Sequence, residues 1–168
     1  MVHPLVTQLR FARSEFVRGF EGVSPEEAVR RIEPMNTLSW TVGHLANQEQ
    51  FLWVVMPQGR IIVPGLNEQV GTGHPAGAPG WLEMWEAWRA ITAAADKYLD
   101  TLTPEMLSVH LEYDGKPWRE DVGTTLLRNT YHYWFHLGEA YALREMLGHT
   151  GLPGYVGWMD DVRYALEG

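Results

Sequence analysis

Four long stretches of this chain place apolar residues every three or four positions, the spacing of amphipathic α-helices. The stretches begin near Pro4, run from about Thr37 to Val55, begin near Pro79 or Gly80, and run from about Gly123 to Leu147. An amphipathic helix cannot bury its apolar stripe alone, so the four stripes must pack against one another. The sequence therefore predicts an all-α protein built as a four-helix bundle.

Shorter signals lie between these stretches. Ser24, Pro25 and Glu27 have the spacing of an N-cap, a first-turn proline and a capping-box partner, so a short helix is expected there, ended by Pro34. Asp114-Gly115 is a turn signal between two extended stretches and indicates a small hairpin. The tail from Gly151 is expected to start as a loop and to finish as a short helix.

Residues 57–80 are rich in glycine and proline and have no clear period, which indicates a long connection. Such a connection can carry the chain back to the other end of a bundle, so the second and third long helices should run roughly parallel. On the second helix we expect Trp40, Phe51 and Val55 to share one apolar row.

Length and composition restrict the class of protein. A chain of 168 residues with 45% hydrophobic residues is expected to form a single globular domain over residues 1–168. A net charge of -8 with scattered basic residues argues against a nucleic-acid partner. The N-terminus lacks the pattern of a signal peptide and no apolar run reaches the length of a membrane span, so the sequence predicts a cytoplasmic protein without a membrane partner.

Three histidines indicate a metal site. His132 and His136 are spaced i, i+4 in the fourth helix, so both imidazoles lie on one face about one turn apart. His44 lies on the apolar row of the second helix, one turn after Trp40. Because the chain has no cysteine, any ligands must be nitrogen or oxygen atoms. Three imidazoles leave positions open on the ion, as in catalytic sites; the alternative is three buried histidines satisfied by hydrogen bonds.

The remaining histidines are expected to be exposed or to cap local structure; of these only the loop residue His74 is kept as a candidate pocket residue. Their positions are His3, His74, His110 and His149.

Two further polar residues of the fourth helix are candidate catalytic residues. Glu139 follows His136 by three positions, and it can orient an imidazole, act as a fourth ligand or serve as a general base, or it can be a solvated charge. Asn129 precedes His132 by three positions and can hydrogen-bond substrate or a histidine nitrogen, or be an ordinary helix residue. Asn47 and Gln48, one turn after His44, are weaker candidates of the same kind. The chain has no HExxH, GxSxG or ExxH motif, which argues against zincin, α/β-hydrolase and di-iron chemistry.

Two motifs carry a family resemblance. NTLSWTVGHLANQEQFLW resembles the second-helix motif of the DinB/YfiT-like superfamily, and NTYHYWFHLGEAYALREMLG resembles its fourth-helix motif with an H-x-x-x-H-x-G-[EQ] core. The resemblance implies a four-helix bundle with up-down-down-up connectivity, often a homodimer. It also implies a divalent metal, commonly zinc or nickel, held by His44, His132 and His136.

The same resemblance implies an activity. The family includes thiol-dependent enzymes, so a metal-dependent transferase that combines a low-molecular-weight thiol with a small-molecule substrate is the leading hypothesis. In the isomerase branch a glutamate stands at the position of His132, so that reaction does not carry over. A metal-dependent hydrolase and a non-catalytic, metal-stabilised stress-response or binding protein remain as alternatives.

Overall fold

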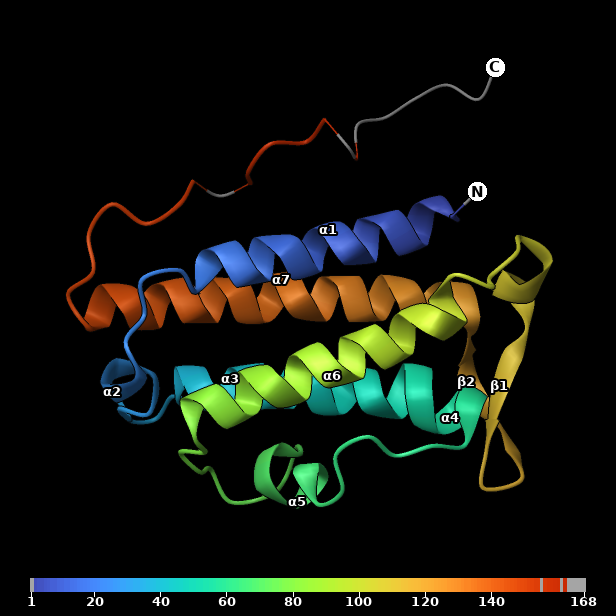
Figure 1. The fold of residues 1–168 in the computed structure, drawn as a ribbon, viewed down its shortest axis with the longest axis horizontal. Helices are drawn as coiled ribbons and strands as arrows, with labels where there is room; N and C mark the ends of the chain where they lie inside the picture. The colour runs from blue at the N-terminus through green and yellow to red at the C-terminus, as the bar shows by residue number, and fades with distance from the viewer. Residues whose placement is uncertain (1, 155, 161, 163–168) are drawn as a thin grey trace.

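The computed structural model describes residues 2–154, 156–160 and 162, and it is predominantly helical (Figure 1). The four long helical segments are α1 (Pro4–Gly19), α3 (Leu38–Glu49) with its continuation, α6 (Trp81–Leu99) and α7 (Val122–Met146). The all-α fold is therefore confirmed. Helix α1 packs along α7, and α3 packs along α6 (Figure 1). In Figure 1 the chain enters α3 and α6 at the same end of the molecule.

The short elements follow the local sequence signals. Helix α2 (Pro25–Ala28) has the full capping box, since Ser24 and Glu27 exchange side-chain and backbone hydrogen bonds. Strands β1 (His110–Tyr113) and β2 (Lys116–Asp121) form an antiparallel hairpin. Asp114 and Gly115 both have positive φ, at 52° and 70°, as the tight turn between the strands requires. The helix expected at the end of the tail falls largely on residues outside those described.

The second long helix differs from its prediction. The α-helix ends at Glu49 and continues as a π-helix, η1 (Gln50–Val55), before the short α4 (Met56–Gln58). Because i→i+5 hydrogen bonds wind an extra residue into each turn, the following side chains rotate around the axis. Trp53 and Val54 are fully buried as a result, whereas Phe51 and Val55, expected on the buried row, are half-buried.

The connection over residues 57–80 also contains structure that its sequence did not indicate. The short helix α5 (Leu66–Val70) packs on α3, with Leu66 and Val70 buried. Gly43 permits this approach, because a Cβ atom there would lie 3.0 Å from Val70 Cγ1 and 2.3 Å from Met84 Sδ. The connection is therefore docked onto the second helix at the turn that carries His44.

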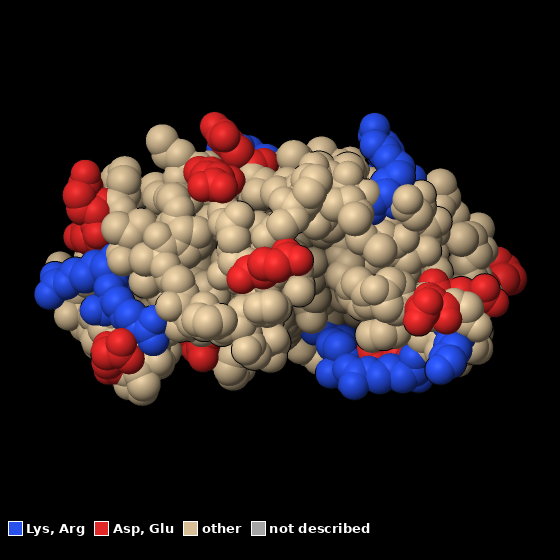
Figure 2. All heavy atoms as spheres, turned by 90° about the horizontal axis from the view of Figure 1, so that it is seen from below, with Lys and Arg blue, Asp and Glu red and all other residues tan. Residues whose placement is uncertain are grey.

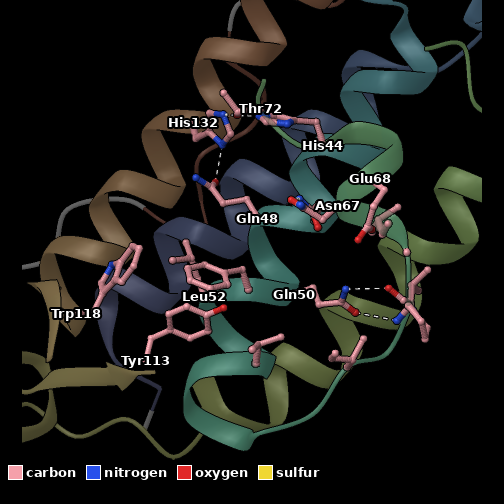
Figure 3. A pocket seen from close by; sticks show the side chains of 18 of the residues that line it. His44, Gln48, Gln50, Leu52, Asn67, Glu68, Thr72, Tyr113, Trp118 and His132 are labelled. Atoms are coloured by element: carbon pink, nitrogen blue, oxygen red, sulfur yellow. Dashed lines mark hydrogen bonds between the residues drawn. The ribbon is translucent and has the colours of Figure 1, made fainter. Parts of the chain in front are cut away.

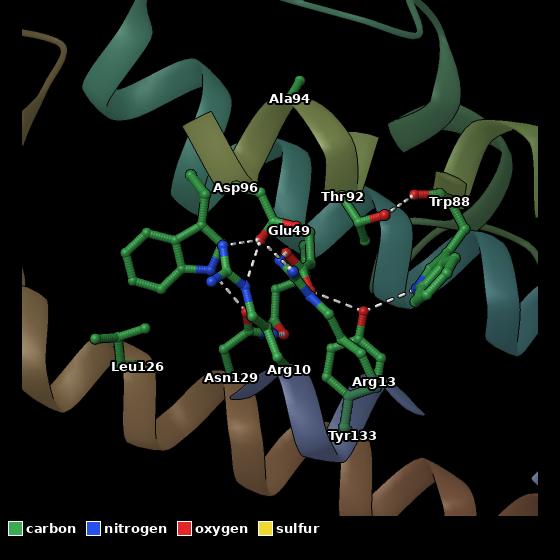
Figure 4. A network of polar contacts seen from close by, with 12 residues as sticks. Arg10, Arg13, Glu49, Trp88, Thr92, Ala94, Asp96, Leu126, Asn129 and Tyr133 are labelled. Carbon is green, nitrogen blue, oxygen red and sulfur yellow. Dashed lines mark hydrogen bonds and ion pairs between the residues drawn. The ribbon is translucent and has the colours of Figure 1, made fainter. Parts of the chain in front are cut away.

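A buried polar network joins the four long helices (Figure 4). Arg13 of α1 donates from Nε to Glu49 Oε1 of α3 at 2.7 Å. The hydroxyl of Tyr133 on α7 donates to the same carboxylate at 2.8 Å, and Trp88 Nε1 of α6 donates to that hydroxyl at 2.8 Å. Burial, together with the Glu49 charge, raises the pKa of Tyr133 well above its usual value, so the phenol stays protonated and can donate.

The surface agrees with the charge pattern of the sequence. On the face in Figure 2, lysine and arginine side chains form separate small groups with uncharged and acidic surface between them. Among the described residues, no helix combines the length and the apolar character needed to cross a bilayer.

Candidate metal centre

The three histidines singled out by the sequence lie together between α3 and α7. The Nε2 atom of His132 is 3.2 Å from Nε2 of His44 and 2.9 Å from Nε2 of His136. One nitrogen from each ring lies within 4.8 Å of the other two. His44 and His136 are buried and His132 is half-buried.

Each ring is oriented by an acceptor on its opposite edge. His44 Nδ1 is 2.9 Å from the carbonyl oxygen of Val70, which can only accept, so this nitrogen carries the proton. His136 Nδ1 donates to Glu139 Oε2 at 2.7 Å. His132 Nδ1 faces Gln48 Oε1 (Figure 3). In neutral rings protonated at Nδ1, all three Nε2 atoms are unprotonated acceptors.

The orientation of Gln48 is itself fixed by neighbours. The indole Nε1 of Trp53 is a donor only and gives its hydrogen to Asn129 Oδ1 at 2.7 Å. Asn129 must therefore present its amide nitrogen to Gln48 Oε1, at 3.1 Å. The Gln48 oxygen accepts from both Asn129 and His132, which sets the tautomer of that histidine.

Electrostatics keep the rings neutral. Burial, then the nearby His44, lowers the pKa of His132 to about 4, and burial, then His132 and His44, lowers the pKa of His136 to about 3. Burial also lowers the pKa of His44, against the opposing effect of the Val70 carbonyl. Neutral imidazole is the form that binds metal.

The donor set fits a divalent cation. Three lone pairs that face one another at these distances repel, and no hydrogen remains on Nε2 to relieve the repulsion. Ligand nitrogens about 2.0–2.1 Å from a tetrahedral zinc ion lie about 3.3 Å apart, close to the distances from His132 Nε2 to the other two Nε2 atoms. Trp40 stacks on His44 with a centroid distance of 4.4 Å and an interplanar angle of 11°, which covers one side of the group.

The other candidate residues from the sequence lie outside the group of three histidines. Glu139 holds the outer edge of His136, and burial raises the pKa of its carboxyl group. Asn129 is fully buried and reaches His132 only through Gln48. His74 is exposed and pairs with Asn67, at 3.4 Å, rather than joining the histidine group. Asn47 lines the neighbouring cavity and donates to Asn67 at 3.0 Å.

His3 and His110 serve local structure, as expected, whereas His149 is half-buried and makes a long-range contact that the expectation did not include. His3 accepts from the backbone N–H of Leu5 at the start of α1. His110 contacts the Trp118 carbonyl across the hairpin, and His149 contacts Glu27 at 3.1 Å.

A large cavity opens beside His44 and His132. Its volume is about 890 Å³, and Gln48, Phe51, Tyr113 and Trp118 are among its lining residues (Figure 3). A second hollow, of about 560 Å³, lies along the outer side of α7 and includes Leu127, Tyr131 and Phe135. The two hollows share four lining residues: Gln48, Arg119, Arg128 and His132.

Sequence reasoning did not foresee Val70, Gln48 as the partner of His132, or the aromatic wall from the hairpin. Gln48 had a usable signal, since it follows His44 by one helical turn. Val70 had none, because it contributes a backbone oxygen.

A comparison with known protein families shows which family the chain belongs to. The family described as the DinB superfamily matches residues 8–140, which include all three clustered histidines, the whole of α3 and the part of α7 that carries His132 and His136. The chain belongs to the DinB superfamily. No match is found among the curated proteins.

Proposed function

We propose that this chain is an up-down-down-up bundle that binds a divalent metal ion, zinc or nickel, through His44, His132 and His136. We further propose that it transfers a low-molecular-weight thiol to a small-molecule electrophile. The observation that carries the proposal is the convergence of the Nε2 atoms of three histidines beside a cavity. Membership of the DinB superfamily supports it.

The ion would supply positive charge that lowers the pKa of a thiol held next to it. Other groups of the protein hold the three histidine rings in position for the ion. Val70, Gln48 and Glu139 each hold one ring by its Nδ1 atom, so the Nε2 atoms keep a fixed separation. Trp40 excludes water from one side of His44, and the cavity leaves the other side accessible to reactants.

In the reaction we propose, the thiol loses its proton to solvent. The thiolate sulfur forms a bond to an electrophilic carbon, and the leaving group departs with the electron pair of the bond that breaks. The thiol and the electrophile must both reach the same point beside the ion. The two hollows that meet at His132 and Gln48 supply such space, one for each reactant.

This arrangement favours transfer over hydrolysis. A metal-dependent hydrolase commonly uses a carboxylate base next to the activated water. Among the described residues, the group of closely spaced potential ligands contains three histidines and no carboxylate. Glu139 is occupied on the outer edge of His136.

Metal binding is tested by elemental analysis of the purified protein. We expect close to one equivalent of metal in the native chain and loss of metal in His136→Ala. The matched control is His74→Ala, which removes an exposed histidine near the site and should keep the metal. Equal metal content in all three proteins would contradict the site.

The reaction is tested by consumption of several low-molecular-weight thiols with a chromogenic aryl halide. We expect thiol consumption above buffer only with metal, and not in His136→Ala. Metal-dependent hydrolysis of ester or amide substrates without any thiol would instead establish the hydrolase. A bound metal without either activity, whose removal only lowers stability, would establish the non-catalytic alternative.

A homodimer remains part of the proposal. Tyr131 and Phe135 on α7 are 63% and 61% exposed, so apolar surface is available for a second copy. Analytical ultracentrifugation decides between monomer and dimer.

A further inference from the structure

The cavity beside the histidines has two chemically different ends. His44 and His132 lie at one end, and Tyr113 and Trp118 lie toward the other (Figure 3). The ring of Phe51 packs against these two aromatic residues. At about 890 Å³ the cavity falls within the range of sites that take small organic ligands, about 300–1,000 Å³.

The aromatic end is built from two separate elements. Phe51 comes from η1, and Tyr113 and Trp118 come from the hairpin. The Phe51 ring lies edge-on to Tyr113 at 4.9 Å and to Trp118 at 5.2 Å between centroids. Tyr113 is 47% exposed, so aromatic surface remains open to a planar group of a ligand.

The rim next to the aromatic end carries two arginines, Arg119 and Arg128. Arg128 donates from Nε to both oxygens of Glu120, at 2.9 and 2.7 Å. Arg119 lies farther from the same carboxylate, at 3.7 Å, and its side chain is 66% exposed. Its guanidinium carbon is 5.8 Å from the centroid of the Trp118 ring. Two guanidinium groups therefore share one carboxylate beside the exposed aromatic surface.

The cavity wall facing this end is fixed in place. Gln50 Oε1 accepts from the backbone N–H groups of Ile62 and Val63, both at 2.8 Å. Its Nε2 donates to the Val63 carbonyl at 3.0 Å, as Figure 3 shows. Gln50 thereby ties the connection after α4 to η1, and the cavity is formed before any ligand enters. Glu68, the acidic group of this wall, lies across the cavity from Trp118 (Figure 3).

We infer that this cavity binds an aromatic anion. Its ring lies against Phe51, Tyr113 and Trp118, and its negative group faces Arg119. The inference rests on the proposed function only in assigning this ligand as the electrophile, whose reactive end would point toward His132. Binding itself requires the hairpin and η1, not the ion.

The test uses two fluorescent probes that differ in charge. Anilinonaphthalene sulfonate is an aromatic anion, and phenylnaphthylamine is the neutral analogue without the sulfonate. We expect the native protein to bind the anion more tightly. In Arg119→Gln the dissociation constant of the anion should rise about five- to tenfold, while that of the neutral probe stays unchanged.

The matched control is Lys116→Gln, which removes one positive charge from the same hairpin at a residue that does not line the cavity. It should leave both dissociation constants unchanged. Trp118→Leu should weaken the binding of both probes. Circular dichroism of the variant verifies that the helices remain folded. Equal effects of Arg119→Gln and Lys116→Gln on the anion, or no effect of Trp118→Leu on either probe, would overturn the inference.

Repeating the titrations with metal-stripped protein and with His136→Ala separates this inference from the proposed function. If only the metal site is wrong, the probes still discriminate by charge and respond to Arg119→Gln. If only the aromatic-anion site is wrong, metal content and its dependence on His136 persist while the probes fail to discriminate.

Discussion

The indole Nε1–H of Trp53 donates to Oδ1 of Asn129 at 2.7 Å, in the buried interior of the bundle. This contact decides which end of the Asn129 amide faces Gln48, and Gln48 in turn faces His132. A buried aromatic residue of the π-helix thus helps to set the tautomer of a proposed metal ligand two side chains away.

Gln48→Leu should therefore weaken metal binding. The substitution removes the acceptor for His132 Nδ1, so the ring loses its fixed tautomer and orientation, and the affinity for zinc should fall about 10- to 100-fold. Competition with a chromogenic chelator measures the dissociation constant. Gln58→Leu is the control, since Gln58 bonds the carbonyls of Trp53 and Ala94 away from the histidines. An affinity within twofold of the native value in Gln48→Leu would refute the positioning role.

Removing the metal should lower thermal stability. A ligand that binds only the folded chain at about one hundred times its dissociation constant stabilises by about 2.7 kcal/mol. For a chain of this size the melting temperature should fall by about 5–10 °C after chelation. Calorimetry with and without a chelator measures the shift, and His136→Ala should show none. A native melting temperature indifferent to chelation would speak against a metal bound in the fold.

Breaking the buried ion pair should destabilise the fold far more than breaking an exposed one. Glu49 is fully buried and pairs with Arg13, which keeps only the carboxylate of Asp96 as a charged partner when Glu49 becomes glutamine (Figure 4). Urea unfolding of Glu49→Gln should show a loss of about 3–5 kcal/mol. Glu33→Gln removes an exposed partner of Arg31 and should cost less than about 1 kcal/mol. Similar losses in the two variants would show that the network does not stabilise the bundle.

Glu27 should stabilise the fold above about pH 4.5 and lose this contribution as the pH falls toward 2. Hydrogen bonds from the Ser24 backbone and hydroxyl, then from His149, lower the pKa of Glu27 to about 2; Arg144 bonds the other nitrogen of His149. Because the folded pKa lies below the unfolded one, this stabilisation is full above about pH 4.5 and is lost as the pH falls toward 2. The stability gap between the native chain and Glu27→Gln should therefore narrow over that window in urea titrations. Glu26→Gln, which removes a charge from the same turn without the cap, should show no such narrowing.

Local interactions are what the sequence could predict. The capping box at Ser24 and Glu27, the turn at Asp114-Gly115 and the shared face of His132 and His136 all depend on residues within four positions of one another. Backbone geometry fixes such relationships, so spacing alone reveals them. The third histidine was within reach because its helix has a clear apolar row and a family-like motif.

The sequence by itself determined the four long helical segments, the hairpin turn and the three imidazoles on two helices. Only the tertiary structure decided that these rings meet, because His44 and His132 are 88 positions apart and no local rule sets their separation. It also decided the partners of their Nδ1 atoms, the π-helical turn that buries Trp53, and the aromatic wall of the cavity. These features arise from packing between distant segments, where a backbone carbonyl such as that of Val70 leaves no trace in residue type.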